Sequence, residues 1–271
     1  MKFRTGIIIA GLLFCLFMPS VSVAGVSVPS GLTYEKEAAP GGTYKGAIQL
    51  INTGKGPQEV KIYQTDYLFY SDGSNIYGEP GKDPRSNADW ITFSPRRLTI
   101  PPKGTANVDY TVQVPDDNAL TGTYWSMLMV EGISSSSPEA VKKEKDVISM
   151  GITQTIRYGL QMITHIGDTG THKLKFVKTK ILKTDDKRTL QIDMENIGER
   201  LLKPALWAEL YDEKGRSVGK FEGEKLRIYP ATSVRFRIDL SRVPKGTYKA
   251  MVVADCGGDD LFGATYTFKF K

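Results

Sequence analysis

The chain repeats one pattern of strands and turns, and this repeat limits the folds open to it more than any other feature. One apolar run ends in Asn52-Thr53-Gly54, and another ends in Asn196-Ile197-Gly198. Later in each copy a Gly-Thr-Tyr motif opens a further apolar run, at Gly122 and again at Gly246. Asn and Gly tolerate the left-handed backbone conformation, so both Asn-x-Gly motifs predict turns. The repeat therefore predicts two copies of one domain.

Short stretches of alternating apolar and polar residues predict β-strands in both copies. A period of two is typical of a strand with one buried face, and it is clear in residues 108–114, 234–240 and 266–270. Seven short antiparallel strands in about 100 residues are typical of an immunoglobulin-like sandwich. The sequence thus predicts an all-β fold of two tandem immunoglobulin-like β-sandwich domains. The strands expected in the second copy are Leu174–Leu182, Thr189–Met194, Ala205–Tyr211, Ser217–Ile228, Ser233–Leu240, Thr247–Ala254 and Leu261–Phe270.

The N-terminus has the three parts of a secretory signal. Lys2 and Arg4 precede an apolar run over residues 6–18, and the small-x-small step Ser22-Val23-Ala24 follows. The run is too short to span a bilayer, which needs roughly 20 apolar residues. We expect residues 1–24 to be a cleaved signal peptide and the product to be exported, with no transmembrane segment after cleavage. The two domains are then expected over residues 25–167 and 168–271.

The chain is poor in the residues that metal sites and many active sites need. It has 2 cysteines and 2 histidines in 271 residues, which argues against a disulfide scaffold, a zinc site and histidine-dependent catalysis. The carboxylates of Asp255-Cys-Gly-Gly-Asp-Asp260 lack the ligand spacing of an EF-hand, so a hairpin turn is favoured there over a calcium site. We expect no cofactor, no metal and no catalytic residue, and therefore not an enzyme.

Several aromatic residues have a predicted place. Tyr124 and Tyr248 begin the penultimate strands, Trp207 lies on the third strand of the second copy, and all three are expected in the cores. The first copy carries an insertion at Ser71–Asp89. Aromatic residues on and near it suggest either sugar-ring stacking at a sandwich edge or, the favoured interpretation, core packing: Tyr63, Tyr67, Phe69, Tyr70 and Tyr77.

The segment Val147–Gly167 alternates apolar and polar residues over about 19 positions, whereas a typical strand has about 5 or 6. One interpretation is a continuous strand that completes the first domain and leads into the second. The other is an edge strand that offers main-chain hydrogen bonds and an apolar row to a strand of another protein.

Two motifs are similar to motifs of a known protein family. Trp90-Ile-Thr-Phe-Ser-Pro95 and Leu98-Thr-Ile-Pro-Pro-Lys-Gly104, together with a signal peptide, two sandwich domains and the long strand, resemble the PapD-like periplasmic chaperones of pilus assembly. The resemblance implies a periplasmic location and a pilus or fimbrial subunit as partner, completed by donor strand complementation. It also implies an outer-membrane usher as a further partner.

The resemblance carries over to particular residues. Five on the apolar row are the candidate donor side chains: Ile148, Met150, Ile152, Ile156 and Tyr158. The family holds a subunit's C-terminal carboxylate with two basic residues in the cleft between its domains. Arg157 has the parity of the second and is the candidate carboxylate anchor, whereas the first strand, residues 26–34, has no arginine for the other.

An alternative function comes from a second resemblance and from the charge. Residues 90–130 are also similar to envelope proteins that interact with peptidoglycan and WxL-type surface proteins. Residues 25–167 hold 13 basic and 15 acidic residues, whereas residues 168–271 hold 21 and 15. The excess follows the lysines of residues 173–183, which protect a strand edge from aggregation or face an anionic polymer. Export makes nucleic acid an unsuitable partner.

Overall fold

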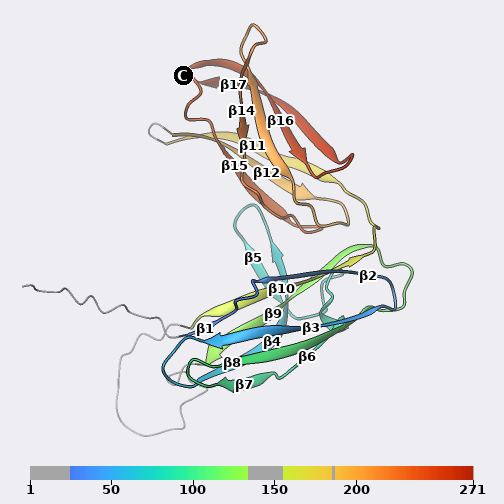
Figure 1. The fold of residues 1–271 in the computed structure, drawn as a ribbon. Coiled ribbons are helices and arrows are strands. Elements are labelled where there is room, and N and C mark those ends of the chain that lie inside the picture. The colour runs from blue at the N-terminus through green and yellow to red at the C-terminus, as the bar shows by residue number, and fades with distance from the viewer. Residues whose placement is uncertain (1–24, 134–154, 185–186, 271) are drawn as a thin grey trace, which may run out of the picture.

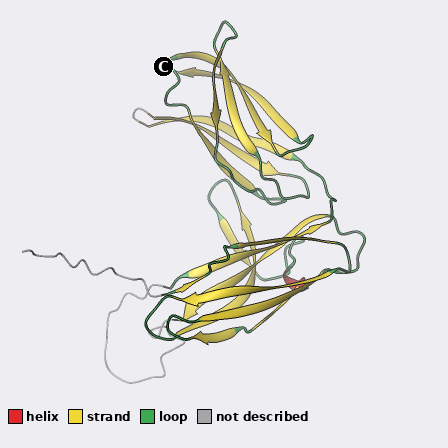
Figure 2. Ribbon diagram, viewed as in Figure 1, coloured by secondary structure: helices red, strands yellow, loops and turns green. Residues whose placement is uncertain are grey.

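The computed structural model describes residues 25–133, 155–184 and 187–270, and their strands form two β-sandwiches (Figures 1 and 2). We call strands β1 to β10 the first sandwich and β11 to β17 the second sandwich. This architecture confirms the predicted fold class. In the described residues, no helix is long and apolar enough to cross a membrane.

The first sandwich consists of two sheets and one 3-10 turn, η1 (Ala88–Trp90). Its four-stranded sheet has the order β1 (Val26–Ser27), β3 (Thr43–Asn52), β8 (Thr105–Gln113), β6 (Ile91–Ser94). The facing sheet has the order β2 (Thr33–Ala38), β10 (Arg157–Ile166), β9 (Gly122–Ile133), β4 (Gln58–Phe69), β5 (Asn75–Gly78), and β7 (Arg97–Ile100) also pairs with β4.

The second sandwich packs a sheet of three strands on one of four. The first has the order β11 (Leu174–Thr184), β12 (Lys187–Asn196), β15 (Ser233–Asp239), and the second β14 (Ser217–Glu222), β13 (Ala205–Tyr211), β16 (Gly246–Asp255), β17 (Leu261–Phe270). The strands predicted here are all present, except that residues 223–228 form only isolated bridges. The predicted turn at Asp255–Asp260 joins β16 to β17, and Gly257 N–H donates to Asp255 Oδ1 at 2.8 Å.

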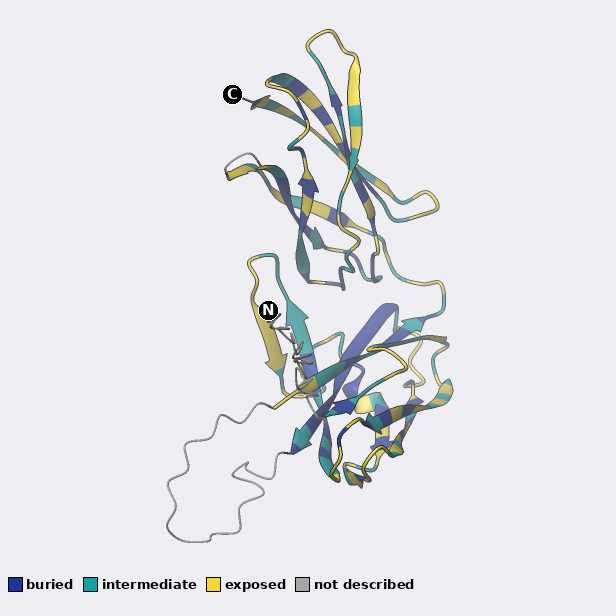
Figure 3. Ribbon diagram, turned by 60° about the vertical axis from the view of Figure 1, so that its left-hand side comes forward, coloured by how far each residue is buried: buried dark blue, intermediate teal, exposed yellow. Residues whose placement is uncertain are grey.

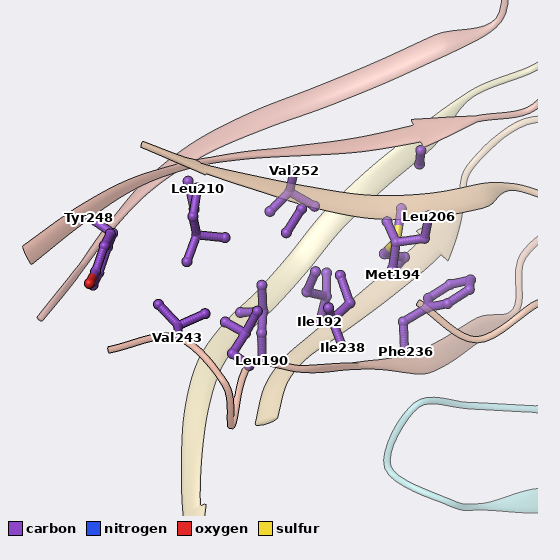
Figure 4. Packing of buried hydrophobic residues seen from close by; sticks show 14 of the residues in the cluster. Leu190, Ile192, Met194, Leu206, Leu210, Phe236, Ile238, Val243, Tyr248 and Val252 are labelled. Carbon is purple, nitrogen blue, oxygen red and sulfur yellow. The ribbon is translucent and has the colours of Figure 1, made fainter. Parts of the chain in front are cut away.

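Each sandwich encloses its own apolar core, made by the inward positions of alternating strands. Strand β12 shows the principle, since Leu190, Ile192 and Met194 are fully buried and point toward the opposite sheet (Figure 4). Figure 3 shows how buried and exposed residues alternate along the strands of the second sandwich. Because each sheet covers the other's apolar face, no disulfide is needed to close either core.

The repeat read from the sequence recurs in the hydrogen bonds of the Asn-x-Gly turns. Asn52 Nδ2 donates to the carbonyl oxygens of Gly56, Ile100 and Pro101 at 2.8, 3.0 and 3.1 Å. Asn196 Nδ2 donates in the same way to Arg200 and Ile228 at 2.6 and 2.8 Å. In both turns the Asn Oδ1 accepts the N–H of the glycine two residues later. Each asparagine thus joins a turn to a neighbouring loop of its own sandwich.

The three aromatic residues expected in the cores differ in outcome. Tyr124 and Tyr248 are buried. The prediction for Trp207 is wrong, because Leu206, Ala208 and Leu210 occupy the inward positions of β13 and leave Trp207 on the outer face. There its ring is half-buried beneath Lys220, whose Nζ lies 4.0 Å from the ring centroid.

The insertion at residues 71–89 forms β5 and a loop that the buried carboxylate of Asp66 holds in place. Asp66 accepts the backbone N–H groups of Gly81, Lys82 and Asp83 at 2.8–3.0 Å, and the hydroxyl of Ser86. Of the five aromatic residues expected to pack in a core, Phe69 contacts a buried cluster but Tyr77 is exposed. The prediction of core packing is therefore wrong for Tyr77, which lies on the edge strand β5.

Candidate partner-binding site

The first part of β10 has an open edge. Along its whole length, from Arg157 to Ile166, β10 pairs with β9. On its other side it pairs with β2 in parallel, but only from Gln161 onward. Among the described residues, no strand lies beside residues 157–160 on that side. The preceding strand, β1, pairs with β3 of the opposite sheet, and the chain crosses to β2 only afterwards.

Backbone groups of β10 point toward this open edge. Gln161 N–H donates to the carbonyl of Leu32, on the β2 side, at 2.8 Å. Because backbone groups of alternate residues point to the same side of a strand, the N–H and C=O groups of Arg157 and Gly159 point to that side too. No strand of the described residues pairs with them, so they can bond a strand laid against residues 157–160.

The apolar row of β10 leaves the core of the first sandwich as it approaches this edge. Leu160 is fully buried, Tyr158 is half-buried against the same core, and Ile156 is 36% exposed. The remaining candidate donor residues, Ile148, Met150 and Ile152, lie outside the described residues. Among the described residues β10 begins at Arg157, and Thr155 and Ile156 precede it outside the strand.

Arg157 binds a carboxylate of its own sandwich. Its Nε lies 2.8 Å from Glu131 Oε2, and its Nη2 lies 3.3 Å from Oε1. Lys61 Nζ lies 3.5 Å from the same carboxylate, and Tyr63 O–H donates to it at 3.0 Å. Burial alone would raise the pKa of Glu131, but the hydrogen bonds from Tyr63 and Arg157 and the nearby cationic charges hold it below its ordinary value. Glu131 therefore stays ionised as the partner of Arg157.

The junction between the sandwiches lies at the other end of β10. His165 is eight residues from Arg157, about 26 Å along an extended strand. Its Nε2 lies 2.8 Å from Glu35 Oε1. From the second sandwich, Lys203 Nζ lies 2.7 Å from Glu35 Oε1 and Arg227 Nη1 lies 4.0 Å from Oε2. Arg157 is thus not among the cationic groups at this junction.

No sequence pattern predicted that Glu35, Lys203 and Arg227 meet at the junction between the sandwiches. Burial alone would raise the pKa of Glu35, but hydrogen bonds from Lys203 and His165, and their charges, bring that pKa below its ordinary value. The carboxylate is therefore a charged link between β2 of the first sandwich and the second sandwich.

An apolar cluster lies beside this charged link. Trp125 and Ile163 come from β9 and β10, and Leu201 and Tyr229 come from the second sandwich. The rings of Trp125 and Tyr229 are 4.9 Å apart. Tyr229 is only 1% exposed, and its hydroxyl donates to Gln161 Oε1 at 2.6 Å. Burial raises the pKa of this hydroxyl well above its ordinary value, so Tyr229 is a neutral anchor.

Glu199 completes the junction through its backbone and its carboxylate. Thr123 N–H donates to the Glu199 carbonyl at 2.8 Å, and the carboxylate accepts from Thr121 Oγ1 at 2.9 Å and from Arg85 Nη2 at 3.1 Å. A Cβ at Gly122 would lie 2.2 Å from the Glu199 carbonyl oxygen, so only glycine permits this approach. The contacts are specific and hold the two sandwiches together.

Comparison with known proteins finds a likeness in architecture alone. No protein-family model and no curated protein matches the chain. The solved structures that it resembles are fimbrial chaperones. The class 5 fimbriae chaperone CfaA is 12% identical with a TM-score of 0.45, and the match covers 90% of this chain and 98% of that one.

Two further structures match to a similar extent. The chaperone DraB of E. coli is 13% identical with a TM-score of 0.42, over 89% of this chain and 98% of DraB. The CsuC–CsuE chaperone–tip subunit complex of Acinetobacter baumannii gives 15% identity and a TM-score of 0.44, over 89% of this chain and 98% of that one.

In the described residues, no group of three His, Cys, Asp or Glu side chains is placed to hold a metal ion.

Proposed function

We propose that the chain is an exported, non-enzymatic chaperone of pilus assembly that binds a pilus-type subunit by strand addition at β10. The observation that carries the proposal is the open edge at residues 157–160, where β10 has, among the described residues, a neighbouring strand on one side only. An added strand gains main-chain hydrogen bonds there without displacing a strand of the chaperone. The signal at residues 1–24 delivers the chain to the periplasm, and an outer-membrane usher is the proposed receiver of the complex.

The apolar row supports this proposal. Even-numbered residues of β10 face the core of the first sandwich, and that core ends near Tyr158. If the strand continues toward Ile148, then Met150, Ile152 and Ile156 extend the row beyond the residues that could bury it. Such side chains suit a subunit whose own sandwich lacks a strand, because they fill the subunit's core.

The carboxylate anchor is the weaker part of the proposed mechanism. Arg157 lies at the open edge, so a subunit's terminal carboxylate could reach it. That carboxylate would have to compete with Glu131, which already binds the Arg157 guanidinium at 2.8 Å. Arg157→Gln is therefore expected to weaken subunit binding less than loss of the apolar row does.

The test is co-purification of the full chain with a co-expressed pilus-type subunit that lacks one strand of its sandwich. Ile156→Asp is expected to abolish co-purification, because a charge in the apolar row cannot enter the subunit core. Val218→Asp, on β14 of the second sandwich, is the matched control, since Val218 is 37% exposed against 36% for Ile156. Retained binding by a folded Ile156→Asp variant would contradict strand addition.

The alternative is an envelope protein that binds an anionic polymer through β11. Lys175, Lys178, Lys180 and Lys183 are exposed on β11, an edge strand of the second sandwich. This function predicts that the chain sediments with purified peptidoglycan at physiological salt and that replacing these lysines with glutamine releases it. Sedimentation without subunit binding would favour the alternative over the chaperone function.

A further inference from the structure

A groove runs between the β4–β5 hairpin of the first sandwich and β15 of the second. The hairpin extends toward the second sandwich in Figure 1, and its loop is seen again near Phe236 in Figure 4. The groove has a volume of about 440 Å³, within the range of small-ligand sites. Its walls are Tyr67, Phe69, Tyr70, Ser71, Asp72, Gly73, Asn75, Leu226, Ser233, Val234, Arg235 and Arg237.

Direct contacts between the two sandwiches hold the walls of this groove. Ser71 N–H donates to Ser233 Oγ at 2.9 Å. Deeper in the junction, the rings of Phe69 and Tyr229 meet edge to face with centroids 5.7 Å apart. The groove is therefore formed before any ligand arrives, and a ligand within it contacts both sandwiches.

Three aromatic rings line one wall of the groove, those of Tyr67, Phe69 and Tyr70, and we call them the aromatic strip. The Tyr67 ring lies 5.5 Å from Phe69 in a tilted stacking arrangement. Tyr77, outside the groove lining, packs 5.1 Å from the Tyr67 ring, and the Tyr67 hydroxyl donates to Asn75 Oδ1 at 2.7 Å, so the ring is held against β5. Tyr70 follows β4 directly. Such a strip offers flat faces on which the C–H face of a sugar ring can stack.

The opposite wall contributes two arginines with different surroundings. Arg235 binds Asp193 through two bonds, from Nε at 2.7 Å and from Nη2 at 2.9 Å, so its charge is already balanced. Arg237, two residues along β15, is exposed and makes no ion pair with another described residue. It is thus the group in the groove that is available to an anion.

We propose that this groove binds a short glycan that carries a carboxylate. The many polar side chains, Ser71, Asp72, Asn75 and Ser233 among them, suit a ligand with several hydroxyl groups better than an apolar one. The aromatic strip takes the sugar rings, and Arg237 binds the carboxylate. An acidic peptide would satisfy Arg237 but would leave the strip of three rings without a matching surface.

The test measures binding of tri-galacturonate to the full mature chain by titration calorimetry. Maltotriose is the neutral comparison, and a hexaglutamate peptide is the acidic peptide comparison. The acidic sugar is expected to bind best. Arg237→Gln should weaken it about tenfold, as expected when one charged hydrogen bond is lost. Tyr70→Ala should weaken both sugars. Lys249→Gln removes the same charge from an exposed position of β16, outside the groove, and should leave the affinity unchanged.

Four results would overturn the proposal. The first three are equal loss of affinity in Arg237→Gln and Lys249→Gln, tighter binding of hexaglutamate than of the acidic sugar, and no binding of either sugar to a folded chain. Equal binding of both sugars, unaffected by Arg237→Gln, would exclude the acidic class of ligand. The groove is separate from the open edge of β10, so subunit capture by Arg237→Gln should match that of the unchanged chain.

Discussion

In both sandwiches a buried asparagine ties an Asn-x-Gly turn to a neighbouring loop, but the corner at the Gly-Thr-Tyr motif differs between them. In the second sandwich the Tyr248 hydroxyl donates to the Pro244 carbonyl at 3.1 Å, four residues back along the chain. In the first sandwich the Tyr124 ring instead packs 4.6 Å from Trp90 and beneath the guanidinium of Arg85.

The difference follows from what each corner has to do. Arg85 belongs to the insertion of the first sandwich, and it also donates to the Thr121 carbonyl and to Glu199 across the junction. The second copy, without an insertion, keeps a corner closed by its own backbone. A repeated domain thus keeps the turns that its own fold needs, and it changes the corner that faces its neighbour.

The largest expected effect is at Tyr229. This residue precedes Pro230, and at the equivalent position of the first copy Pro101 precedes Pro102. Tyr229→Ala removes a buried ring that contacts Trp125 and Phe69 of the first sandwich. A buried aromatic replaced by alanine costs about 3–5 kcal/mol. We expect the sandwiches to lose their coupling, so that calorimetry shows two separate unfolding transitions instead of one.

Tyr229→Phe is the control for this experiment. It keeps the ring and removes the hydroxyl, which bonds Gln161 Oε1 and the side chain of Arg227, so it should preserve joint unfolding with a small decrease in midpoint. A single unchanged transition in Tyr229→Ala would show that the apolar cluster does not couple the sandwiches.

The two turn asparagines provide the next comparison. Asn52→Ala and Asn196→Ala each remove hydrogen bonds to carbonyl groups of a neighbouring loop, and a buried group left unsatisfied costs about 1–3 kcal/mol. The Pro101 and Ile228 carbonyls keep a second donor, the N–H of Gly104 and of Leu202. Asn52 donates to three carbonyls and Asn196 to two, so Asn52→Ala should lower the free energy of unfolding more. Urea denaturation of the two variants measures the free energy of unfolding of each. The reverse order would contradict the prediction that the number of lost hydrogen bonds determines the loss of stability.

The tyrosine corner predicts a smaller and one-sided effect. Tyr248→Phe removes the hydrogen bond to Pro244 and should cost about 1 kcal/mol. Tyr124→Phe should cost almost nothing, because no hydrogen bond of its hydroxyl with another described residue is present and its ring contacts remain. Thermal melts of the two variants measure this difference. An equal loss of stability in both would mean that the Tyr124 hydroxyl stabilises its corner as much as the Tyr248 hydroxyl does.

Local alternation explains why the strands could be predicted and the junction could not. Ala205–Tyr211 and Leu261–Phe270 were expected with the bounds that they have, because period two is a property of neighbouring residues. The same alternation in Leu206, Ala208 and Leu210 placed Trp207 outside, and the prediction failed because it relied on residue type rather than on parity.

The junction depends on contacts between distant parts of the sequence. Glu35 and Lys203 are 168 residues apart, and no local pattern marks them as partners. The pairing of Arg157 with Glu131 likewise follows from the register of β10 against β9. The parity of Arg157 was available from the sequence, but its distance from the junction was not.

The smallest expected effect is a pH dependence of the contact between the sandwiches. The pKa of Glu35 in the folded chain lies below its ordinary value of 4.5. Its contribution to stability is therefore fully present above that value and is lost as the pH falls through the folded pKa. Once the pH has fallen through this folded pKa, below 4.5, the protonated carboxyl no longer attracts Lys203 and Arg227, and the junction should loosen before either core unfolds.

Limited proteolysis of the junction residues 167–173 across pH 3 to 6 measures this loosening. Other carboxylates also become protonated as the pH falls, including Asp193 in the second sandwich and Glu131 in the first, whose pKa values lie below their ordinary values. The decisive quantity is therefore the difference in cleavage rate between the unchanged chain and the Glu35→Gln variant. The variant should be cut more readily at pH 6 and should approach the unchanged chain as the pH falls. If the two chains are cut alike at pH 6, the Glu35 contacts do not hold the sandwiches together, and the apolar cluster around Tyr229 and the contacts of Glu199 do so without them.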